Sequence, residues 1–323
     1  MTIPTTMKAV QAETTGAADV LEVKTVEVPE VSDAQVLVRV HASSVNPADV
    51  LGRQMKLGKL PRGTGADYAG EVVLVGGKIA GLRTGDSVWG YLGGGVTGHL
   101  GAAAEYVAVT KEQIGRAPRG VDAVDTAALA TTGLTALQSL RALRLRPGSK
   151  LLIVGASGGV GTAAIQLARA LGVEVTAVAS SANADYCREL GATHVVDYRD
   201  VGDITTAKFD ALLDCHGGDL GRYLQAVRRG GRAVEIAAKG FGRALASWVS
   251  LRGPRVRIVI AKSSRADLEE LAGKIEAGHL SAVVDEVFPL DQIVTAHRQV
   301  ETGHARGKRV LDLRLALGPR DRA

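Results

Sequence analysis

The spacing of apolar residues changes character twice along the chain. Up to about residue 122 the apolar residues form short runs between glycines and prolines, for example VLVRV at 36–40 and YVAV at 106–109. Short runs with this punctuation predict strands, so the region is expected to be an irregular β-rich domain. Beyond residue 263 helical spacing predicts two helices, at 266–277 and 290–302, separated by VVDEVF and followed by the strand RVLDL. We assign this tail to the first domain.

The middle of the chain alternates strands with helices. A helical stretch at 122–145 precedes Pro147 and Gly148, and five strands follow: LLIVG, VEVTAVAS, HVVDY, ALLDC and RAVEIA. These strands are apolar on both faces, as expected for a parallel sheet that helices cover on both sides. The predicted fold class is therefore α/β, a doubly wound parallel sheet inserted in a β-rich domain. We place the sheet domain at 123–263 and the β-rich domain at 1–122 and 264–323.

Composition and charge narrow the class of protein. A chain of 323 residues can bury two cores, and its apolar residues are mainly aliphatic, with only 3% aromatic, which suits a valine-rich parallel sheet. The net charge of +5 is spread along the chain, so it favours a phosphorylated cofactor over nucleic acid as the anionic partner. Two cysteines exclude a disulfide framework and a four-cysteine zinc lobe. Without a signal core or membrane segment, we expect a soluble cytoplasmic protein.

A glycine-rich motif follows the first strand of the predicted sheet. The strand at 151–154 runs into GASGGVG at 155–161, and an alanine-rich helix comes next. Glycine has no β-carbon, so backbone N–H groups can approach a diphosphate, and the helix presents its positive N-terminal end to that charge. The alternative is a turn whose glycines serve only tight packing of strand and helix. We favour binding of a dinucleotide diphosphate by Ser157, Gly158, Gly159, Val160 and Gly161.

Seven ordered stretches resemble one enzyme family over essentially the full chain. The chain resembles the zinc-independent quinone oxidoreductase branch, the zeta-crystallin-like branch, of the medium-chain dehydrogenase/reductase superfamily. This resemblance implies a GroES-like substrate domain interrupted by a Rossmann domain, with the active site in the cleft between them. The matching stretches are SVNPAD at 44–49, GADYAG at 65–70, GDSV at 85–88, AEY at 104–106, TGLTA at 132–136, GASGGVG at 155–161 and GHARGK at 303–308.

The resemblance also implies which residues surround the adenosine end of the cofactor. In the family the second sheet strand ends at the adenosine ribose, where an acidic residue would bind the 2′-hydroxyl of NAD. Here the strand at 173–180 ends without a carboxylate, while Ser180, Ser181, Tyr198 and Arg199 offer donors and positive charge. We therefore expect NADPH as the cofactor.

Two observations qualify that expectation. Asn183 stands where NADPH-binding relatives often carry a lysine, and the two serines alternatively cap the helix that starts near it.

At the nicotinamide end the resemblance implies five neighbouring residues. For His216 the alternative is a local hydrogen-bonding role. The five are Thr132, His216, Ile236, Ala237 and Ala238.

The zinc ligands of alcohol-oxidising relatives are missing from the matching positions. Asn46 stands at the first cysteine position, Ala48 at the proton-relay hydroxyl, Ala66 at the histidine position, and the last ligand falls within 128–130, which is all alanine and leucine. We expect no metal. Asn46 is the predicted catalytic residue, because an amide can donate to a carbonyl oxygen that gains charge during hydride transfer; its alternative role is to cap the turn at Pro47.

Three functional hypotheses follow. The first is a zinc-independent NADPH-dependent reductase of quinones or other conjugated carbonyl compounds. The second is an enoyl-thioester or polyketide enoyl reductase, although Leu51 and Met55 occupy the region where such relatives often place a tyrosine. The third is a cofactor-bound regulatory or RNA-binding protein, which only the net positive charge supports.

We expect a homodimer that pairs through the strand at 255–260. Asp49 and Asp67 are expected to order the loops rather than to act as acid or base.

Overall fold

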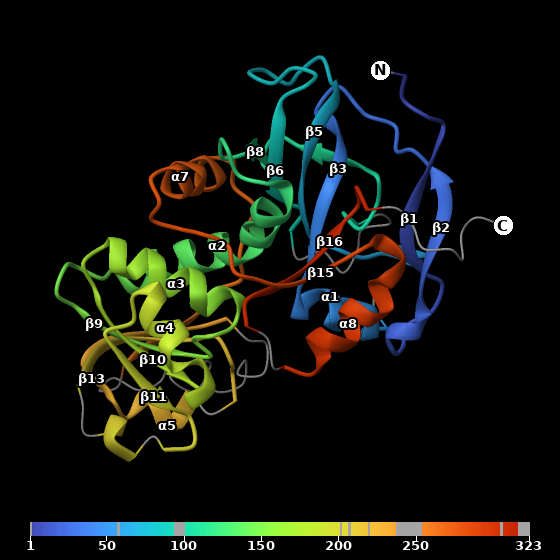
Figure 1. Ribbon diagram of the computed structural model, residues 1–323. Helices are drawn as coiled ribbons and strands as arrows, with labels where there is room; N and C mark the ends of the chain where they lie inside the picture. Colours follow the sequence, from blue (N-terminus) through green and yellow to red (C-terminus); the bar gives the residue numbers. More distant parts are fainter. Residues whose placement is uncertain are drawn as a thin grey trace. The chain divides into compact units, whose positions relative to one another are not determined.

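The computed structural model describes residues 2–56, 59–93, 101–200, 202–205, 208–218, 220–236, 254–303 and 306–315 (Figure 1). Contacts divide the chain into two compact units. Unit 1 comprises residues 1–131, 262–278 and 282–323, and unit 2 comprises residues 132–261 and 279–281. The long helix α2, Ala123–Leu143, belongs to both, because Thr131 closes the first segment of unit 1 and Thr132 opens unit 2.

Unit 2 is built on a six-stranded parallel sheet in the order β11-β10-β9-β12-β13-β14. The order reverses between β9 and β12, and in doubly wound sheets ligands bind outside the carboxyl ends of the strands at such a reversal. Helices α3 and α4 pack on β9, β10 and β11, and α5 packs on β12 and β13. The strands are β9 Lys150–Val154, β10 Glu174–Ala179, β11 His194–Asp197, β12 Phe209–Asp214, β13 Val227–Glu235 and β14 Arg255–Ile258. The helices are α3 Gly159–Ala170, α4 Ala184–Leu190 and α5 Leu220–Leu224, with short 3-10 helices η2 Ser181–Asn183 and η3 Gly202–Thr205.

Aliphatic side chains make this sheet stable. Leu152, Val178, Leu212 and Val256 come from four different strands and are all almost fully buried in one cluster. Burial on both faces explains why these strands are nearly continuous apolar runs. The α/β fold class expected from the sequence is confirmed.

Unit 1 contains a seven-stranded, mostly antiparallel sheet and a three-stranded one. The larger has the order β15-β16-β3-β5-β6-β8 with β7 also paired to β3, and the smaller has the order β2-β1-β4. Strand β16 pairs antiparallel with β3, so residues 308–312 belong to the same sheet as the first region of the chain. The strands are β1 Thr6–Ala12, β2 Leu21–Glu27, β3 Gln35–Val45, β4 Arg62–Gly63, β5 Asp67–Val75, β6 Ser87–Tyr91, β7 Tyr106–Thr110, β8 Ile114–Arg116, β15 Val284–Phe288 and β16 Lys308–Asp312.

Two helices of unit 1, α7 and α8, lie close to predicted positions, whereas α1 was not predicted. The helices are α1 Pro47–Gln54, α7 Arg265–Glu276 and α8 Ile293–Glu301, with 3-10 helices η1 Ala18–Val20 and η5 Leu290–Gln292. The helix predicted at 290–302 is thus a 3-10 turn followed by a shorter α-helix, because Pro289 directs the chain into a tight first turn. In the described part of the chain, no helix combines the length and apolar character needed to cross a membrane. Both cysteines are free thiols.

Candidate active site

The glycine-rich turn joins β9 to α3, as the motif predicted. Gly155 adopts a positive φ of 73°, and the Gly158 N–H donates to its carbonyl oxygen at 3.2 Å. A β-carbon on Gly161 would lie 2.5 Å from that same oxygen, so only glycine allows the helix to pack this close to the strand. A β-carbon on Gly158 would meet nothing nearer than 3.5 Å. Packing therefore requires Gly161, while the space in front of Gly158 is open to a ligand.

This open space fits the diphosphate of a dinucleotide. Residues 157–160 are only partly buried, and Gly158 caps α3 without any side chain. The N–H groups in the first turn of a helix lack intrahelical acceptors, so they point toward this space together with the positive end of the helix. A diphosphate held here would receive these hydrogen bonds.

His216 lies beside the glycine-rich turn. Its backbone N–H and that of Gly217 donate to Asp214 Oδ1 at 2.9 and 2.8 Å, which fixes the turn after β12. A β-carbon on Gly155 would lie 3.4 Å from the His216 β-carbon. Asp214 is fully buried, and its other oxygen has no hydrogen-bond partner among the described residues. Asp214 was not predicted as a site residue, because its only signal in the sequence is its position as the last residue of a buried strand.

Two further residues predicted for the nicotinamide end, Thr132 and Ile236, lie in described parts of unit 2. The Ile236 N–H donates to the Asp214 carbonyl oxygen at 3.1 Å, so the end of β13 lies next to the end of β12. Thr132 is buried within α2. Ala237 and Ala238 lie outside the described residues.

Two of the four residues predicted to bind the adenosine end, Ser181 and Arg199, contact the carboxylate of Asp197, which was not predicted as a site residue. The Arg199 guanidinium donates to Ser181 Oγ at 3.1 Å and makes two hydrogen bonds to Asp197, at 3.0 and 2.7 Å. The Arg199 backbone N–H donates to the same carboxylate at 2.9 Å. The Ser181 N–H donates to Asp197 at 2.8 Å. The Arg199 guanidinium lies 5.8 Å from the centre of the Tyr198 ring, and Ser180 makes no capping hydrogen bond through its side chain.

The Arg199 guanidinium and two backbone N–H groups hold the pKa of Asp197 well below its usual range, so this carboxylate is ionised. The second strand itself ends without an acid, as predicted, but Asp197 stands opposite Ala179 on the neighbouring strand β11. Arg199 is therefore already paired with Asp197, which lies beside the end of β10.

In unit 1, Asn46 is held between an anion and a cation. Its Nδ2 donates to Asp67 Oδ2 at 2.9 Å, and its Oδ1 accepts from Lys308 Nζ at 2.6 Å. Lys308 also donates to the Val45 carbonyl oxygen at 2.8 Å. Because an ammonium group only donates and a carboxylate only accepts, these two neighbours fix the orientation of the amide. Asn46, Asp67 and Lys308 are all almost fully buried.

Three more residues complete this polar cluster. Ser44 donates to the Asp67 oxygen that Asn46 also contacts, and the Thr131 hydroxyl and N–H donate to the other oxygen. Asp49 accepts from the Asn46 N–H at 2.7 Å and so caps the start of α1. We refer to Ser44, Asn46, Asp49, Asp67, Thr131 and Lys308 as the Asn46 cluster.

Burial raises the pKa of Asp49 to about 7, and the nearby charge of Asp67 adds to the effect. Burial also lowers the pKa of Lys308, against the opposing influence of the same two carboxylates. Lys308 was not predicted as a site residue, although it is the last residue of the GHARGK stretch. Within the described residues no group of three histidine, cysteine or acidic side chains is arranged to hold a metal ion.

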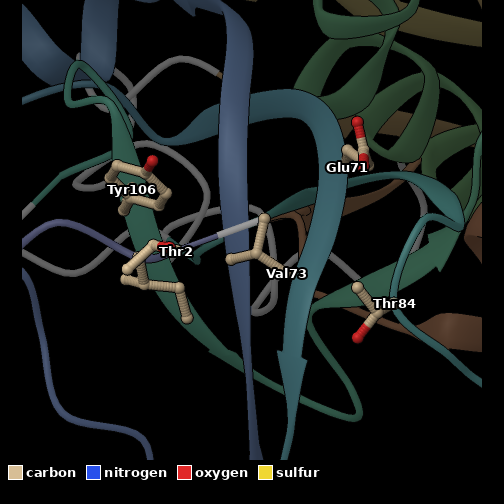
Figure 2. Close-up of a pocket in the computed structure, with 6 residues that line it drawn as sticks. Thr2, Glu71, Val73, Thr84 and Tyr106 are labelled. Carbon is tan, nitrogen blue, oxygen red and sulfur yellow. The ribbon is translucent and has the colours of Figure 1, made fainter.

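A separate shallow pocket lies on unit 1 and contains none of the predicted site residues. Figure 2 shows Glu71 among the residues that line it, and the Glu71 carboxylate is paired with Arg39 at 2.9 Å. Because this ion pair engages the Glu71 carboxylate, we do not assign the pocket a catalytic role. The lining residues are Thr2, Ile3, Glu71, Val73, Thr84 and Tyr106.

Comparison with known proteins yields two family models. One, described as an alcohol dehydrogenase GroES-like domain, matches residues 32–119, and the other, described as a zinc-binding dehydrogenase, matches residues 190–311. A chloroplastic NADPH-dependent alkenal/one oxidoreductase of Arabidopsis thaliana is 32% identical over 96% of this chain and 80% of its own length. A trans-enoyl reductase of Aspergillus terreus is 32% identical over 97% of this chain and 98% of its own. The solved quinone oxidoreductase of Coxiella burnetii has a TM-score of 0.88 and 31% identity, and the match covers 95% of this chain and 99% of that one.

Proposed function

Because the chain belongs to the medium-chain dehydrogenase/reductase superfamily, we propose that it is a zinc-independent, NADPH-dependent reductase of quinones or other conjugated carbonyl compounds. The relatives support an NAD(P)H-dependent reductase of the quinone, alkenal or enoyl type. The observation that carries the finer proposal is the pairing of Asn46 with Lys308. An ammonium group 2.6 Å from Asn46 Oδ1 repels a metal cation at the position where related enzymes bind zinc.

The cofactor would be held by unit 2. The backbone of residues 157–161 would bind its diphosphate, and Ser180, Ser181, Tyr198 and Arg199 would bind the 2′-phosphate. Thr132, His216, Ile236, Ala237 and Ala238 would border the nicotinamide and its ribose. When bound, this cofactor supplies the hydride. Since Arg199 shares its charge with Asp197, we expect the preference for NADPH over NADH to be modest.

Asn46 would donate a hydrogen bond to the acceptor oxygen. One of its amide hydrogens is engaged by Asp67 at 2.9 Å, whereas the other faces only the Ser44 carbonyl oxygen at 3.5 Å, the limit of a hydrogen bond. The Lys308 ammonium on Oδ1 withdraws charge from the amide and strengthens it as a donor. One such neutral donor stabilises an acceptor that already delocalises added charge, as quinones and conjugated enones do.

The second candidate is reduction of enoyl thioesters, which the similarity to a trans-enoyl reductase favours. One panel decides between the two. Quinones, enones and enoyl thioesters are each assayed with NADPH and with NADH, and kcat/KM is compared. We expect the quinone or enone to be the best acceptor and simple ketones to be poor. A thioester preferred by tenfold or more establishes the second candidate, and no oxidation of either cofactor with any acceptor contradicts both.

We further propose a homodimer formed through the edge of the unit 2 sheet. Strand β14 is the last strand of that sheet, and it pairs on only one side among the described strands. Just beyond it, Ile260 is 66% exposed, which makes it the most exposed large apolar residue of the described chain. A second copy of the same strand would cover it. Light scattering on the full-length protein at micromolar concentration tests this, and a monomer contradicts it.

A further inference from the structure

Four arginines line one recess of unit 2. Arg232 on β13 and Arg255 on β14 stand directly opposite each other in the parallel register, and Arg257 lies two residues further along β14 on the same face. Arg144, at the end of α2, has a positive φ of 54°. The recess is lined by Ala142, Arg144, Arg232, Ala233, Arg255 and Arg257.

The described part of the chain gives none of these four guanidinium groups a carboxylate partner. Other arginines of unit 2 differ, because Arg228 is paired with Asp210 at 2.6 Å and Arg188 with Asp185 at 2.7 Å. Burial and the charges of the other three arginines lower the pKa of Arg232. The positive charges in this recess therefore repel one another, and no described carboxylate pairs with them.

The sequence around β14 supplies no carboxylate either. The sequence from 236 to 266 contains seven lysines and arginines and no aspartate or glutamate, so this stretch offers no carboxylate. On β13, Glu235 is three residues from Arg232, and strand alternation directs its side chain to the opposite face of the sheet. Charged residues on an edge strand often serve to prevent aggregation, which would explain Arg255 and Arg257. That role does not explain why Arg232 of β13 and Arg144, which follows α2, line the same recess.

The recess is separate from the expected dinucleotide site. Arg232 precedes Ile236 by four residues, which corresponds to roughly 13 Å along a strand. Ile236 lies at the carboxyl end of the sheet with the glycine-rich turn, while Arg255 is the first residue of β14. The arginine recess and the glycine-rich turn thus lie at opposite ends of the strands of unit 2.

We propose that this recess binds a small phosphate-bearing anion in addition to the dinucleotide. Guanidinium groups match phosphate oxygens with paired hydrogen bonds, and several of them suit a multiply charged group such as a diphosphate. A nucleic acid fits less well, because no aromatic side chain lines the recess for a base to stack on. The bound anion would relieve the repulsion among the four arginines.

Calorimetric titration with inorganic pyrophosphate tests the proposal. The full-length protein is first saturated with NADPH, so that the glycine-rich turn is occupied and only a second site can respond. We expect the wild type to bind pyrophosphate and the double variant Arg255→Gln/Arg257→Gln to bind it at least tenfold more weakly. Arg188→Gln is the matched control, since it removes an exposed arginine of the same unit that has its own carboxylate partner, and it should bind like the wild type. Unchanged NADPH affinity in the double variant shows that unit 2 is folded.

Three outcomes overturn the proposal. The first is no pyrophosphate binding by the NADPH-saturated wild type, and the second is equal binding by the wild type and the double variant. The third is binding of a short single-stranded RNA that the double variant loses while pyrophosphate never binds, which assigns the recess to nucleic acid. Orthophosphate and ATP, titrated in parallel, show whether one phosphoryl group or a chain of them is preferred. None of these measurements depends on reductase activity.

Discussion

Lys308 Nζ lies 2.6 Å from Asn46 Oδ1, and this hydrogen bond decides which end of the Asn46 amide faces Asp67. The amide nitrogen is thereby directed to the carboxylate, and one N–H remains only loosely bound. Asn46 is thus the candidate catalytic residue and Lys308 a positioning residue that acts through it. This relationship leads to the first prediction.

Replacing Lys308 should lower turnover without weakening the binding of the cofactor. In Lys308→Met the amide loses the partner that orients and polarises it, so we expect kcat with a quinone to fall by about tenfold or more. Asn46→Ala should lower kcat by about tenfold to a thousandfold for the same reason. The NADPH dissociation constant, measured by fluorescence titration, should stay within about twofold of wild type in both variants. If Asn46→Ala retains full kcat, another group activates the acceptor.

The Asp197–Arg199 pair should set the cofactor preference. In Asp197→Asn the guanidinium is released from its carboxylate, so NADPH should gain about three- to tenfold in affinity relative to NADH. Arg199→Gln should weaken the binding of NADPH and leave the binding of NADH nearly unchanged. Ser180→Asp should shift the preference toward NADH, because the new carboxylate repels the 2′-phosphate. Calorimetry with each cofactor measures these changes, and Arg188→Gln is again the control. A loss of NADPH affinity in Asp197→Asn would show that the carboxylate orients Arg199 for the phosphate.

Metal removal should leave the enzyme active. The position occupied by Asn46 is flanked by the Lys308 ammonium, which disfavours a divalent cation. Protein treated with a strong chelator and dialysed should retain its quinone or enone reductase rate, and added zinc should not raise it. Elemental analysis of the treated sample confirms that the metal has been removed. Activity that disappears with chelation and returns with zinc contradicts the proposed mechanism.

His297 should make the protein less stable in mild acid. This side chain is fully buried in unit 1, its Nδ1 has no hydrogen-bond partner among the described residues, and its Nε2 lies 3.5 Å from Thr64 Oγ1. Burial, together with the charge of Arg53, lowers the pKa of His297 from 6.5 to about 3. Below pH 6.5 the unfolded chain therefore binds a proton that the folded chain does not, and stability falls as the pH decreases toward 3.

The expected size of this effect is about 1 kcal/mol between pH 7 and pH 5.5, since each pH unit below the unfolded pKa contributes at most about 1.4 kcal/mol. Urea unfolding of wild type and His297→Gln at several pH values measures it. The variant has a lower stability at pH 7, but the difference between the two proteins should shrink as the pH falls. Parallel curves would mean that His297 takes up its proton in the folded protein as easily as in the unfolded chain.

Association through β14 should respond to salt. Arg255 and Arg257 are exposed on this edge strand, so a second copy brings like charges toward each other, and screening should favour the dimer. We expect Ile260→Lys to shift the protein to monomer, while Leu171→Lys, a change at another exposed apolar residue of unit 2, leaves the dimer intact. Light scattering at about 50 and 300 mM salt measures the fraction of dimer. A dimer that persists in Ile260→Lys places the interface elsewhere.

The sequence predicts best those features whose parts are neighbours in the chain. The glycine-rich turn and the strands around it depend on contiguous residues, so their pattern is visible directly. The partners of Asn46 come from other strands: Asp67 is 21 positions away and Lys308 is 262. Asp197 escaped notice for the same reason, because it meets Ser181 only through the register of β10 with β11. Pairing across a sheet depends on tertiary register, which no local pattern encodes.

The antiparallel pairing of β16 with β3 has a consequence for the order of events during synthesis. Unit 2 is nearly continuous in the sequence, so its sheet can form while the ribosome is still adding residues. Unit 1 must wait, because its central strand β3 obtains β16 as a neighbour only after residues 308–312 have emerged. Until then Asp49 and Asp67 have no cation beside them, and the emerging β-rich segment presents an open strand edge to the chaperones around it. Among the described strands, the last in the sequence is therefore the one that brings the Lys308 ammonium to the buried carboxylate of Asp67.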